Sequence, residues 1–211
     1  MPEKEHGLGP EEHGRLVREG YDVIAEDYSK ERSKSDNEEE ILEFISHVPV
    51  GGMVLDIGCG AGMPVLRKLV DNGFRAKGID FSGRMLKLAK CNVPESDLIL
   101  GDITKVEFPP ESFDGIISTY ALIHIHKSQH GQLYNNLHRW LKPGGLMLVS
   151  TAKTAWEEVA EYYGVSMAWS HPNANASVEL ITDAGLEIIF KRLVTSGDET
   201  HLWVLAKKPF L

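Results

Sequence analysis

The chain has 211 residues, 42% of them hydrophobic and 25% charged, a balance that predicts one globular domain with a sizeable core. Its formal net charge of −9 argues against a dedicated nucleic-acid binder and against attachment to anionic membranes, because both need a basic surface. The few cysteines suggest no disulfide framework, and no run approaches about 18 apolar residues, so we expect a cytoplasmic protein.

The first part of the chain is predicted to be helical after a flexible start. Residues 1–14 are polar and rich in Glu, Gly and His, and we expect them to be flexible. Between residues 16 and 28 the apolar side chains recur every three or four positions, which is the spacing of a helix face. A charged run over residues 29–40 indicates a solvated loop or a helix start. Apolar spacing over residues 41–48 then predicts a second helix.

From residue 53 to residue 150, short apolar strands alternate with helices. The strands are predicted at residues 53–57, 75–79, 97–100, 113–118 and 146–150. The helices are predicted at residues 64–72, 83–90 and 129–141. Alternation at this spacing indicates a parallel sheet with helices on both faces.

The end of the chain has a different pattern. A helix is predicted at residues 177–184, and apolar strands follow at residues 186–193 and 201–206. Residues 195–198 are too few for a crossover helix, so these two strands should pair as an antiparallel hairpin at the sheet edge. The predicted fold is a single α/β domain over residues 1–211, with a seven-stranded, mostly parallel sheet and helices on both faces.

A glycine-rich turn follows the first predicted strand. The strand carries Asp56 near its end, and Gly58, Gly60 and Gly62 follow it. Ligands of open α/β sheets bind at the carboxyl ends of the strands, and glycines let the backbone approach a ligand closely. By itself this turn fits a simple strand-to-helix connection, a dinucleotide site or another cofactor site.

Two details oppose a dinucleotide. A G-x-G-x-x-G turn would place its third glycine at position 63, where the chain has Met63. The charge of Asp56 would also repel a pyrophosphate, whereas it suits a ligand with an ammonium or sulfonium group. Asp80 ends the second predicted strand and could accept both ribose hydroxyls, and Asp102 ends the third and could accept an adenine amino group. These acids favour an adenosine ligand without phosphate.

Several segments, taken in order, resemble the motifs of the class I S-adenosylmethionine-dependent methyltransferases: residues 54–62, 78–82, 101–102, 113–118 and 141–145. Residues 21–28 resemble the lid helix of the small-molecule branch of that family. The resemblance implies a Rossmann-like fold, S-adenosylmethionine as the methyl donor, and a helical lid over residues 15–48. Residues 155–211 match less well, and we expect residues 153–176 to form an insert on the acceptor side.

The resemblance also implies which residues bind the cofactor. Those expected at its methionine portion are Asp56, Gly58, Cys59, Gly60 and Gly62. Those expected at its ribose and adenine are Asp80, Phe81, Gly101, Asp102 and Ile103. Those expected to close over it or complete the site are Tyr21, Tyr28, Arg32, Met85 and Ser118.

Methyl transfer from a sulfonium disperses charge, so positioning in dry surroundings can supply most of the catalysis. A base is needed only if the acceptor must lose a proton. His124, just after the fourth predicted strand, is the candidate for that base or for holding the acceptor; alternatively, it only shapes the pocket by hydrogen bonding. His124, His126 and His130 have no nearby Cys or Glu to complete a metal site, so we expect no metal.

The acceptor is expected to be a small molecule, bound by a monomer or homodimer. Further candidate contacts are Tyr120, Trp169 and His171, although a Trp there is equally consistent with core packing. Residues 118–131 contain neither the Asn/Asp-Pro-Pro-aromatic signature of enzymes that methylate base amines nor a glutamate for an arginine substrate. The alternatives are a regulatory S-adenosylmethionine-binding protein without activity and, less favoured, an NAD-dependent oxidoreductase.

Overall fold

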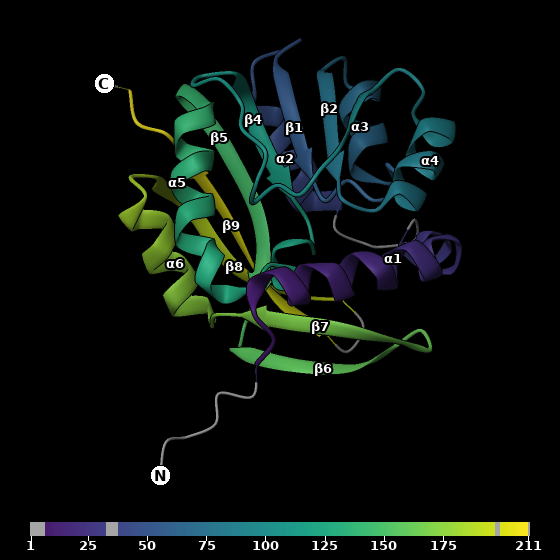
Figure 1. Ribbon diagram of the computed structural model, residues 1–211. Helices are drawn as coiled ribbons and strands as arrows, with labels where there is room; N and C mark the ends of the chain where they lie inside the picture. Colours follow the sequence, from purple (N-terminus) through teal and green to yellow (C-terminus); the bar gives the residue numbers. More distant parts are fainter. Residues whose placement is uncertain (1–6, 33–37, 197–198, 211) are drawn as a thin grey trace.

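The computed structural model describes residues 7–32, 38–196 and 199–210. Within them, one seven-stranded sheet has the order β3-β2-β1-β4-β5-β9-β8 (Figure 1). Its strands are β1 (Met53–Ile57), β2 (Arg75–Asp80), β3 (Asp97–Leu100), β4 (Phe113–Ser118), β5 (Leu141–Ala152), β8 (Glu187–Ser196) and β9 (Glu199–Lys207). Strand β9 is antiparallel to both of its neighbours, and the other described pairings of this sheet are parallel, as expected for this fold class.

The helices are α1 (Pro10–Arg32), α2 (Glu38–His47), α3 (Val65–Asp71), α4 (Gly83–Asn92), α5 (His130–Trp140) and α6 (Ala174–Asp183). Helix α1 begins earlier than predicted, so the expectation of a flexible start is wrong for residues 10–14, while residues 1–6 lie outside the described part. Pro10 suits a first helical position, and Glu11 and Glu12 complement the helix dipole there. Buried His13 also holds this end by donating from Nε2 to the His124 carbonyl (3.0 Å).

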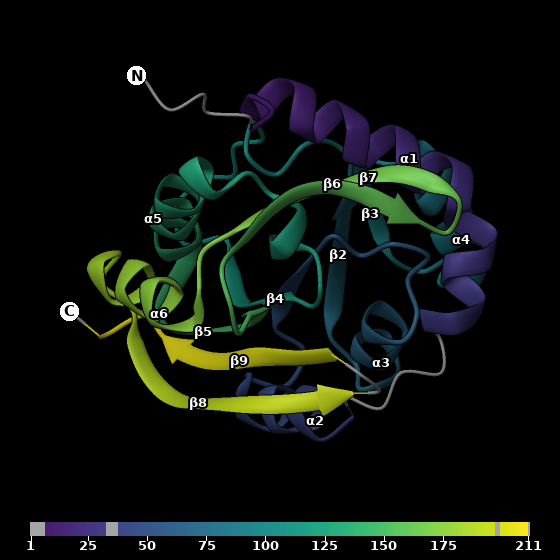
Figure 2. The same ribbon diagram turned by 90° about the horizontal axis from the view of Figure 1, so that it is seen from below.

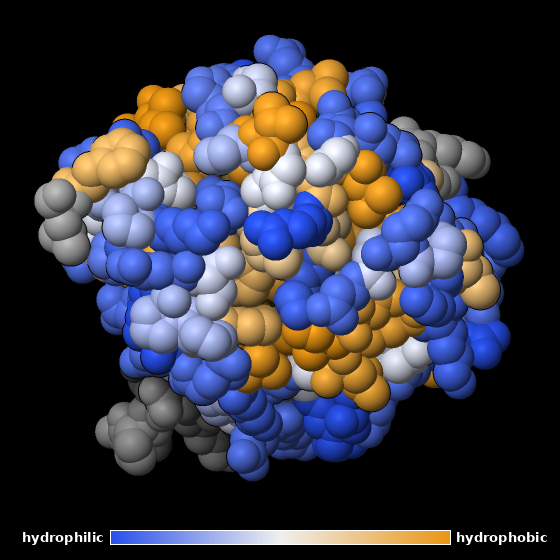
Figure 3. All heavy atoms as spheres, turned by 90° about the horizontal axis from the view of Figure 1, so that it is seen from above, coloured by the Kyte–Doolittle hydropathy of each residue, from blue (hydrophilic) through white to orange (hydrophobic). Residues whose placement is uncertain are grey.

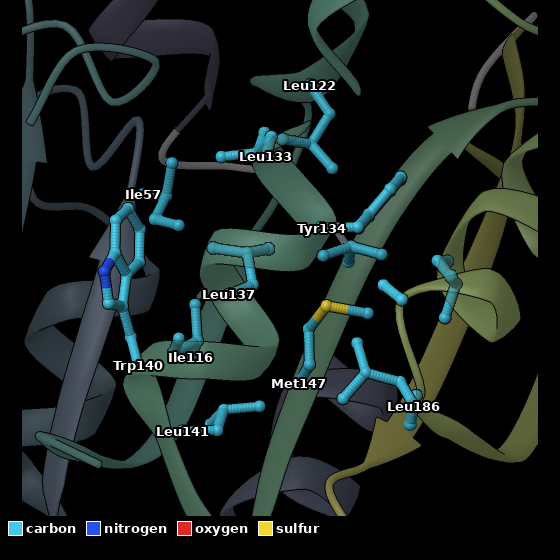
Figure 4. Close-up of a cluster of buried hydrophobic side chains, with 14 of the residues drawn as sticks. Ile57, Ile116, Leu122, Leu133, Tyr134, Leu137, Trp140, Leu141, Met147 and Leu186 are labelled. Carbon is cyan, nitrogen blue, oxygen red and sulfur yellow. The ribbon is translucent and has the colours of Figure 1, made fainter. Parts of the chain in front are cut away.

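Two hydrophobic cores lie on the two faces of the sheet, because successive strand residues point to opposite sides. In β1, Val54 joins the core beneath α2 and α3, and Leu55 joins the core beneath α5 and α6. In β5, Leu148 and Val149 divide in the same way. Figure 4 shows the second of these cores, where side chains of α5 such as Leu137 and Trp140 meet residues of the strands.

The two last strands form the predicted antiparallel hairpin, with β9 inside the sheet and β8 at its edge. Residues 202–206 of β9 are buried without interruption, as suits a strand covered on both faces, whereas exposure alternates along β8. The expected turn at residues 195–198 is described only in part, because residues 197 and 198 lie outside the described chain.

A second sheet, which the sequence did not predict, lies within residues 153–176. Strands β6 (Trp156–Tyr162) and β7 (Val165–His171) pair in antiparallel fashion as a separate hairpin. Its two-residue turn, Tyr163 and Gly164, has φ of +52° and +78°, the backbone that closes a tight hairpin. The hairpin runs along α1 and contacts it through β7, so both cover one end of the main sheet (Figure 2).

The face seen in Figure 3 lies at the other end of the molecule from this hairpin, and its hydrophobic atoms form separate groups among hydrophilic ones. None of the described helices combines the length and the apolar character that crossing a bilayer would require. The expected cytoplasmic location and oligomeric state stay predictions.

Candidate functional site

A pocket opens at the carboxyl ends of β1, β2 and β4, where α1 passes over the sheet. We call it the strand-end pocket. It is lined by Tyr21, Tyr28, Ile57, Gly58, Gly60, Ile79, Asp80, Phe81, Met85, Gly101, Asp102, Ile103, Thr119, Tyr120, Ala121, His124 and Ile125. An adjoining cavity shares several of these residues and adds Arg32, Asp56 and Cys59. Most of the residues predicted to bind the cofactor therefore gather in one place.

Two of the predicted cofactor residues lie outside both cavities. A Cβ at Gly62 would lie 3.0 Å from Val93 and 3.5 Å from Ala89, so this glycine permits close packing on α4. Ser118 is fully buried and donates to the Ile57 carbonyl (3.0 Å), which joins β4 to β1. Neither residue lines the pocket. Each instead allows or makes a contact between the elements that carry it.

The glycine turn is held by two sets of hydrogen bonds. Gly58 and Cys59 both donate from the backbone to the Ile79 carbonyl, at 2.8 and 3.1 Å. Gly58 has φ of +67°, and a Cβ there would approach Ala121 to 2.3 Å, so only glycine fits. Gly60 donates to Asp80 Oδ2 (2.9 Å), which ties the turn to the end of β2.

Two buried carboxyl groups face this turn. Asp56 is 2% exposed, and its Oδ2 has no hydrogen-bond partner among the described residues. Burial, together with the nearby charge of Asp80, raises the pKa of Asp56 to about 8, although Arg32 opposes the shift. Burial also raises the pKa of Asp80 to about 6, against the backbone donors of Ser82 and Gly60. An unpartnered buried carboxyl group is a site where a cation would be stabilised.

The third predicted acid is engaged in its own loop. Asp102 Oδ1 accepts from the backbone (3.0 Å) and the hydroxyl (2.7 Å) of Thr104, and Oδ2 lies 3.6 Å from the Lys105 ammonium. Because Oδ1 is already engaged, Oδ2 is the oxygen of Asp102 that is more available to a ligand at the pocket wall.

Helix α1 is held over the pocket by Asp22, a residue that the sequence did not predict to take part in the site. Asp22 Oδ1 accepts from the Ser82 hydroxyl (2.6 Å) and from the backbone of Arg84 (3.1 Å) at the start of α4. Asp22 lies within the segment that resembles a lid helix, directly after Tyr21. This position in the motif could have identified it as a site residue.

Tyr21 and His124 form a chain of two hydrogen bonds between α1 and the β6–β7 hairpin. The Tyr21 hydroxyl lies 2.9 Å from His124 Nε2, and His124 Nδ1 lies 3.1 Å from the Ala168 carbonyl. A carbonyl can only accept, so Nδ1 carries the hydrogen and Nε2 accepts from Tyr21. Burial lowers the pKa of His124 to about 4, which keeps the ring neutral at neutral pH.

Arg32, at the end of α1, lies over the ring of Tyr120 with 3.9 Å from its guanidinium carbon to the ring centroid. It also donates from Nη2 to the Thr119 hydroxyl (3.4 Å). Tyr120 has φ of +59°, uncommon for a residue with a bulky side chain, and its backbone donates to Ser150 Oγ (2.7 Å). This strained backbone turns the segment after β4 toward the pocket.

A second pocket, the hairpin pocket, lies between α1 and the β6–β7 hairpin. It is lined by Tyr21, Tyr28, Glu31, Arg32, Tyr120, Ile123, His124, Trp156, Ala160, Glu161, Tyr162, Tyr163, Trp169, Ser196 and Glu199. Four of these side chains also line the strand-end pocket: Tyr21, Tyr28, Tyr120 and His124. The two pockets therefore meet at a shared boundary.

Only one of the two candidates from the insert lines the hairpin pocket. Trp169 does, whereas His171 is 5% exposed and lies against the edge of Trp156 (6.3 Å between centroids), outside the pocket. The side chains of His126 and His130 also point to other partners, Ser128 and the Ile125 carbonyl. Across the described chain, no three His, Cys, Asp or Glu side chains are arranged to hold a metal ion.

The sequence is similar to known methyltransferases. A family model for a methyltransferase domain matches residues 54–145, a little under half of the chain. An uncharacterized methyltransferase of Synechocystis sp. is 30% identical over 175 residues, which cover 79% of this chain and 81% of that protein. A phosphoethanolamine N-methyltransferase of Plasmodium falciparum is 27% identical over 201 residues, which cover 91% of this chain and 74% of that protein.

The fold is also similar to solved structures. One is a 1,6-didemethyltoxoflavin-N1-methyltransferase from Burkholderia thailandensis with bound 1,6-didemethyltoxoflavin and S-adenosylhomocysteine. It matches with a TM-score of 0.78 over 96% of this chain and 91% of that chain, at 17% identity. The structural match confirms the fold class, and the sequence matches confirm the family resemblance inferred from the motifs.

Proposed function

The chain belongs to the class I S-adenosylmethionine-dependent methyltransferases, and we propose that it methylates a small molecule bound in the hairpin pocket. The observation that carries this proposal is the boundary shared by the two pockets. Tyr21, Tyr28, Tyr120 and His124 line both, so a ligand in one pocket would contact the same side chains as a ligand in the other. We further propose that the protein works as a monomer or homodimer in the cytoplasm.

The strand-end pocket and the adjoining cavity together have the chemistry to hold the methyl donor. The unpartnered carboxyl group of Asp56 suits the donor's ammonium group, and the turn at Gly58 and Gly60 lets its methionine portion approach the backbone. Asp80 is assigned to the ribose, and Phe81 and Asp102 to the adenine. When bound, the donor supplies a methyl group on a positively charged sulfur.

The contribution of the protein is positioning and the exclusion of water. Helix α1 closes one side through Tyr21 and Tyr28, whose burial raises their pKa values and keeps both hydroxyls protonated. His124 is neutral, and its Nε2 already accepts a hydrogen bond from Tyr21. We therefore assign His124 to holding Tyr21 and the acceptor in place, because a group with so low a pKa is a weak base.

A small acceptor is supported by two similar proteins. By its name, the Plasmodium relative methylates phosphoethanolamine, and the Burkholderia enzyme was solved with 1,6-didemethyltoxoflavin. Both names specify a nitrogen as the methylated atom. Neither molecule is assigned to this chain.

Calorimetric titration with S-adenosylhomocysteine and, separately, with NAD tests the assignment of the strand-end pocket. We expect S-adenosylhomocysteine to bind and NAD to give no heat above dilution. Binding of NAD alone would overturn the proposal.

Transfer of a labelled methyl group to a panel of small amines, phenols, thiols and carboxylic acids tests the activity. Labelled product with any of them supports the enzyme, with heat-inactivated protein as the control. S-adenosylhomocysteine binding without transfer to any chemotype would instead favour the regulatory alternative.

A further inference from the structure

Aromatic rings dominate the hairpin pocket. The β6–β7 hairpin contributes Trp156, Tyr162, Tyr163 and Trp169, and the rings of Tyr162 and Tyr163 lie beside that of Tyr28 on α1. Ring centroids of Tyr162 lie 5.7 Å from Trp169 and 6.4 Å from Tyr28. Aromatic rings from the hairpin and from α1 therefore line the pocket together.

This aromatic wall continues to the boundary with the strand-end pocket. Tyr28 packs edge-on against Tyr21 (5.2 Å between centroids), and Tyr21 packs edge-on against His124 (5.3 Å). Trp169 lies 5.6 Å from His124 on the other side. A group placed among these rings is thereby brought to the boundary where the methyl group would be transferred.

The charged side chains of the hairpin pocket are mostly acidic. Among its described lining residues, Glu31, Glu161 and Glu199 stand against a single guanidinium, that of Arg32. Arg32 lies over the ring of Tyr120 and donates to the hydroxyl of Thr119, so two neutral groups already hold its guanidinium in place. The pocket thus offers an excess of negative charge beside the aromatic rings.

The carboxylate of Glu199 is kept ionised by a neighbouring side chain. Its Oε2 lies 3.1 Å from His201 Nε2. This hydrogen bond lowers the pKa of Glu199 and keeps the carboxylate ionised at neutral pH. The Glu199 side chain is 72% exposed, so it marks the solvent side of the pocket, while the rings enclose the inner side.

We propose that the acceptor is an amine that enters the hairpin pocket as a cation, with aromatic faces and Glu199 recognising the ammonium group. Cations are attracted to the faces of Trp and Tyr rings, and a carboxylate at the rim adds to this attraction. The proposal rests on the proposed function and specifies its substrate class. The same charge balance disfavours amines that also carry a phosphate or a carboxylate, because the described lining residues include three glutamates and a single arginine, Arg32.

The reaction balances for such an acceptor. The ammonium group releases one proton to water, and the neutral nitrogen attacks the methyl carbon. A nitrogen–carbon bond forms, the carbon–sulfur pair returns to sulfur as a neutral thioether, and the methylated nitrogen leaves as an ammonium cation. The overall products from two cations are one cation, one neutral thioether and one proton.

Binding of choline tests the proposal, with 3,3-dimethylbutan-1-ol as the uncharged probe of nearly the same shape and phosphocholine as the phosphorylated one. Each is titrated by calorimetry into the protein saturated with S-adenosylhomocysteine. We expect choline to bind about tenfold or more tightly than the alcohol, as cation–π attraction in a desolvated site predicts. Phosphocholine is expected to bind no more tightly than choline.

Two pairs of variants assign the binding to this pocket. Tyr162→Phe keeps the ring and is expected to bind choline within about threefold of the parent, whereas Tyr162→Leu loses about tenfold. Glu199→Gln is expected to lose about threefold, as befits an exposed charge. Glu187→Gln removes the same charge from the far end of the β8–β9 hairpin, outside the pocket, and is expected to have no effect.

The outcomes separate this inference from the proposed function. If S-adenosylhomocysteine does not bind, the assignment of the strand-end pocket fails, and choline is then titrated into the protein alone. If S-adenosylhomocysteine binds but choline does not, the amine inference is overturned. Binding of the alcohol as tight as that of choline, or tighter binding of phosphocholine, overturns it as well, as does an equal effect of Tyr162→Phe and Tyr162→Leu.

Discussion

Two carboxyl groups at the glycine turn, Asp56 and Asp80, differ in how they are satisfied. Asp80 accepts backbone hydrogen bonds from Gly60 and Ser82, so it already holds the turn in shape before any ligand arrives. Asp56 has one oxygen without a partner, in surroundings that make its ionised form costly. A bound ammonium group would remove that cost, and Asp56 is therefore the residue whose charge should matter most for binding.

Replacement of Asp56 by Asn tests this role. The change keeps the shape and removes the charge, and we expect the affinity for S-adenosylhomocysteine at pH 8 to fall by roughly 10- to 100-fold, as loss of a hydrogen bond to a charged group predicts. Calorimetry gives the dissociation constant. Asp97→Asn on β3, an acid paired with Lys77 at the opposite end of the strands, is the matched control. An unchanged constant in Asp56→Asn would show that the ammonium group lies elsewhere.

The tautomer of His124 leads to a second prediction at this scale. Tyr21→Phe removes the hydroxyl that donates to Nε2 and leaves that nitrogen buried without a partner. We expect the free energy of unfolding to fall by about 1–3 kcal/mol. Chemical denaturation followed by tryptophan fluorescence measures the change. Tyr163→Phe, which removes an exposed hydroxyl bonded to Glu31, serves for comparison and should cost less. Equal losses in both variants would contradict the stabilising hydrogen bond between Tyr21 and His124.

Several site residues at the carboxyl ends of the strands could be predicted from the sequence because each lies in a short motif beside its own strand. Asp56, Gly58 and Asp80 follow this rule. Glu199 and Trp156 could not be predicted in the same way, because antiparallel pairing and the β6–β7 turn bring them to the site from distant parts of the chain. The turn itself gave little signal, since Tyr163 adopts a backbone that tyrosine seldom takes.

At the scale of elements, the contact between α1 and β7 decides how the site is covered. Gly20 is buried in that contact, and a Cβ there would lie 2.8 Å from the Met167 methyl group and 3.5 Å from the Ser166 carbonyl. The absence of a side chain at residue 20 lets the helix lie directly on the hairpin. Helix α1 is thus placed by a close backbone approach on one side and by Asp22 at α4 on the other.

Gly20→Leu is expected to push α1 off β7. Overpacking costs about 1–3 kcal/mol, so the affinity for S-adenosylhomocysteine should fall about tenfold and the amide hydrogens of α1 should exchange faster. Gly14→Leu is the matched control, because no atom lies within 4 Å of a Cβ at that position of the same helix. Hydrogen exchange and calorimetry give the two measurements. Equal exchange rates for α1 in both variants would contradict the proposed packing.

Strand and helix prediction succeeded where a segment had a single clear period. The bounds of β1, β3 and β4 agree with the expectation because each is a short apolar run between turn residues. Strand β5 extends to Leu141–Ala152, past the predicted start at residue 146, because pairing with β4 resumes at Phe113 beyond an irregularity in register. Such extensions depend on the neighbouring strand, and a local pattern does not contain them.

For the whole molecule, four buried groups predict how stability depends on pH without ligand. Asp56 and Asp80 have pKa values raised to about 8 and about 6, so their contributions are present at low pH and lost as the pH rises from 3.8 to those values. His124 and His130 have pKa values lowered to about 4, so their contributions are lost as the pH falls from 6.5 to 4. The two pairs oppose each other up to about pH 6, and above pH 6.5 Asp56 acts alone.

The free energy of unfolding is therefore expected to be nearly level from about pH 4 to pH 6 and to fall from about pH 6.5 to pH 8, by at most about 1.4 kcal/mol per unit. Denaturant titrations at several pH values measure it. Asp56→Asn should remove the fall, and saturating S-adenosylhomocysteine should reduce it by favouring the ionised carboxylate. A stability that rises over the upper range would refute the burial of Asp56 in the ligand-free protein.

The place of β9 has a consequence for synthesis of the protein. This strand is the last of the sheet to leave the ribosome, yet it lies inside the sheet between β5 and β8 and brings Glu199 to the hairpin pocket. Until residues 199–207 emerge, β5 has an open edge and β8 has no neighbour to join. Folding of the sheet must therefore finish after translation of nearly all the sequence described here. Until then the nascent chain exposes a strand edge, which is a site for chaperone binding.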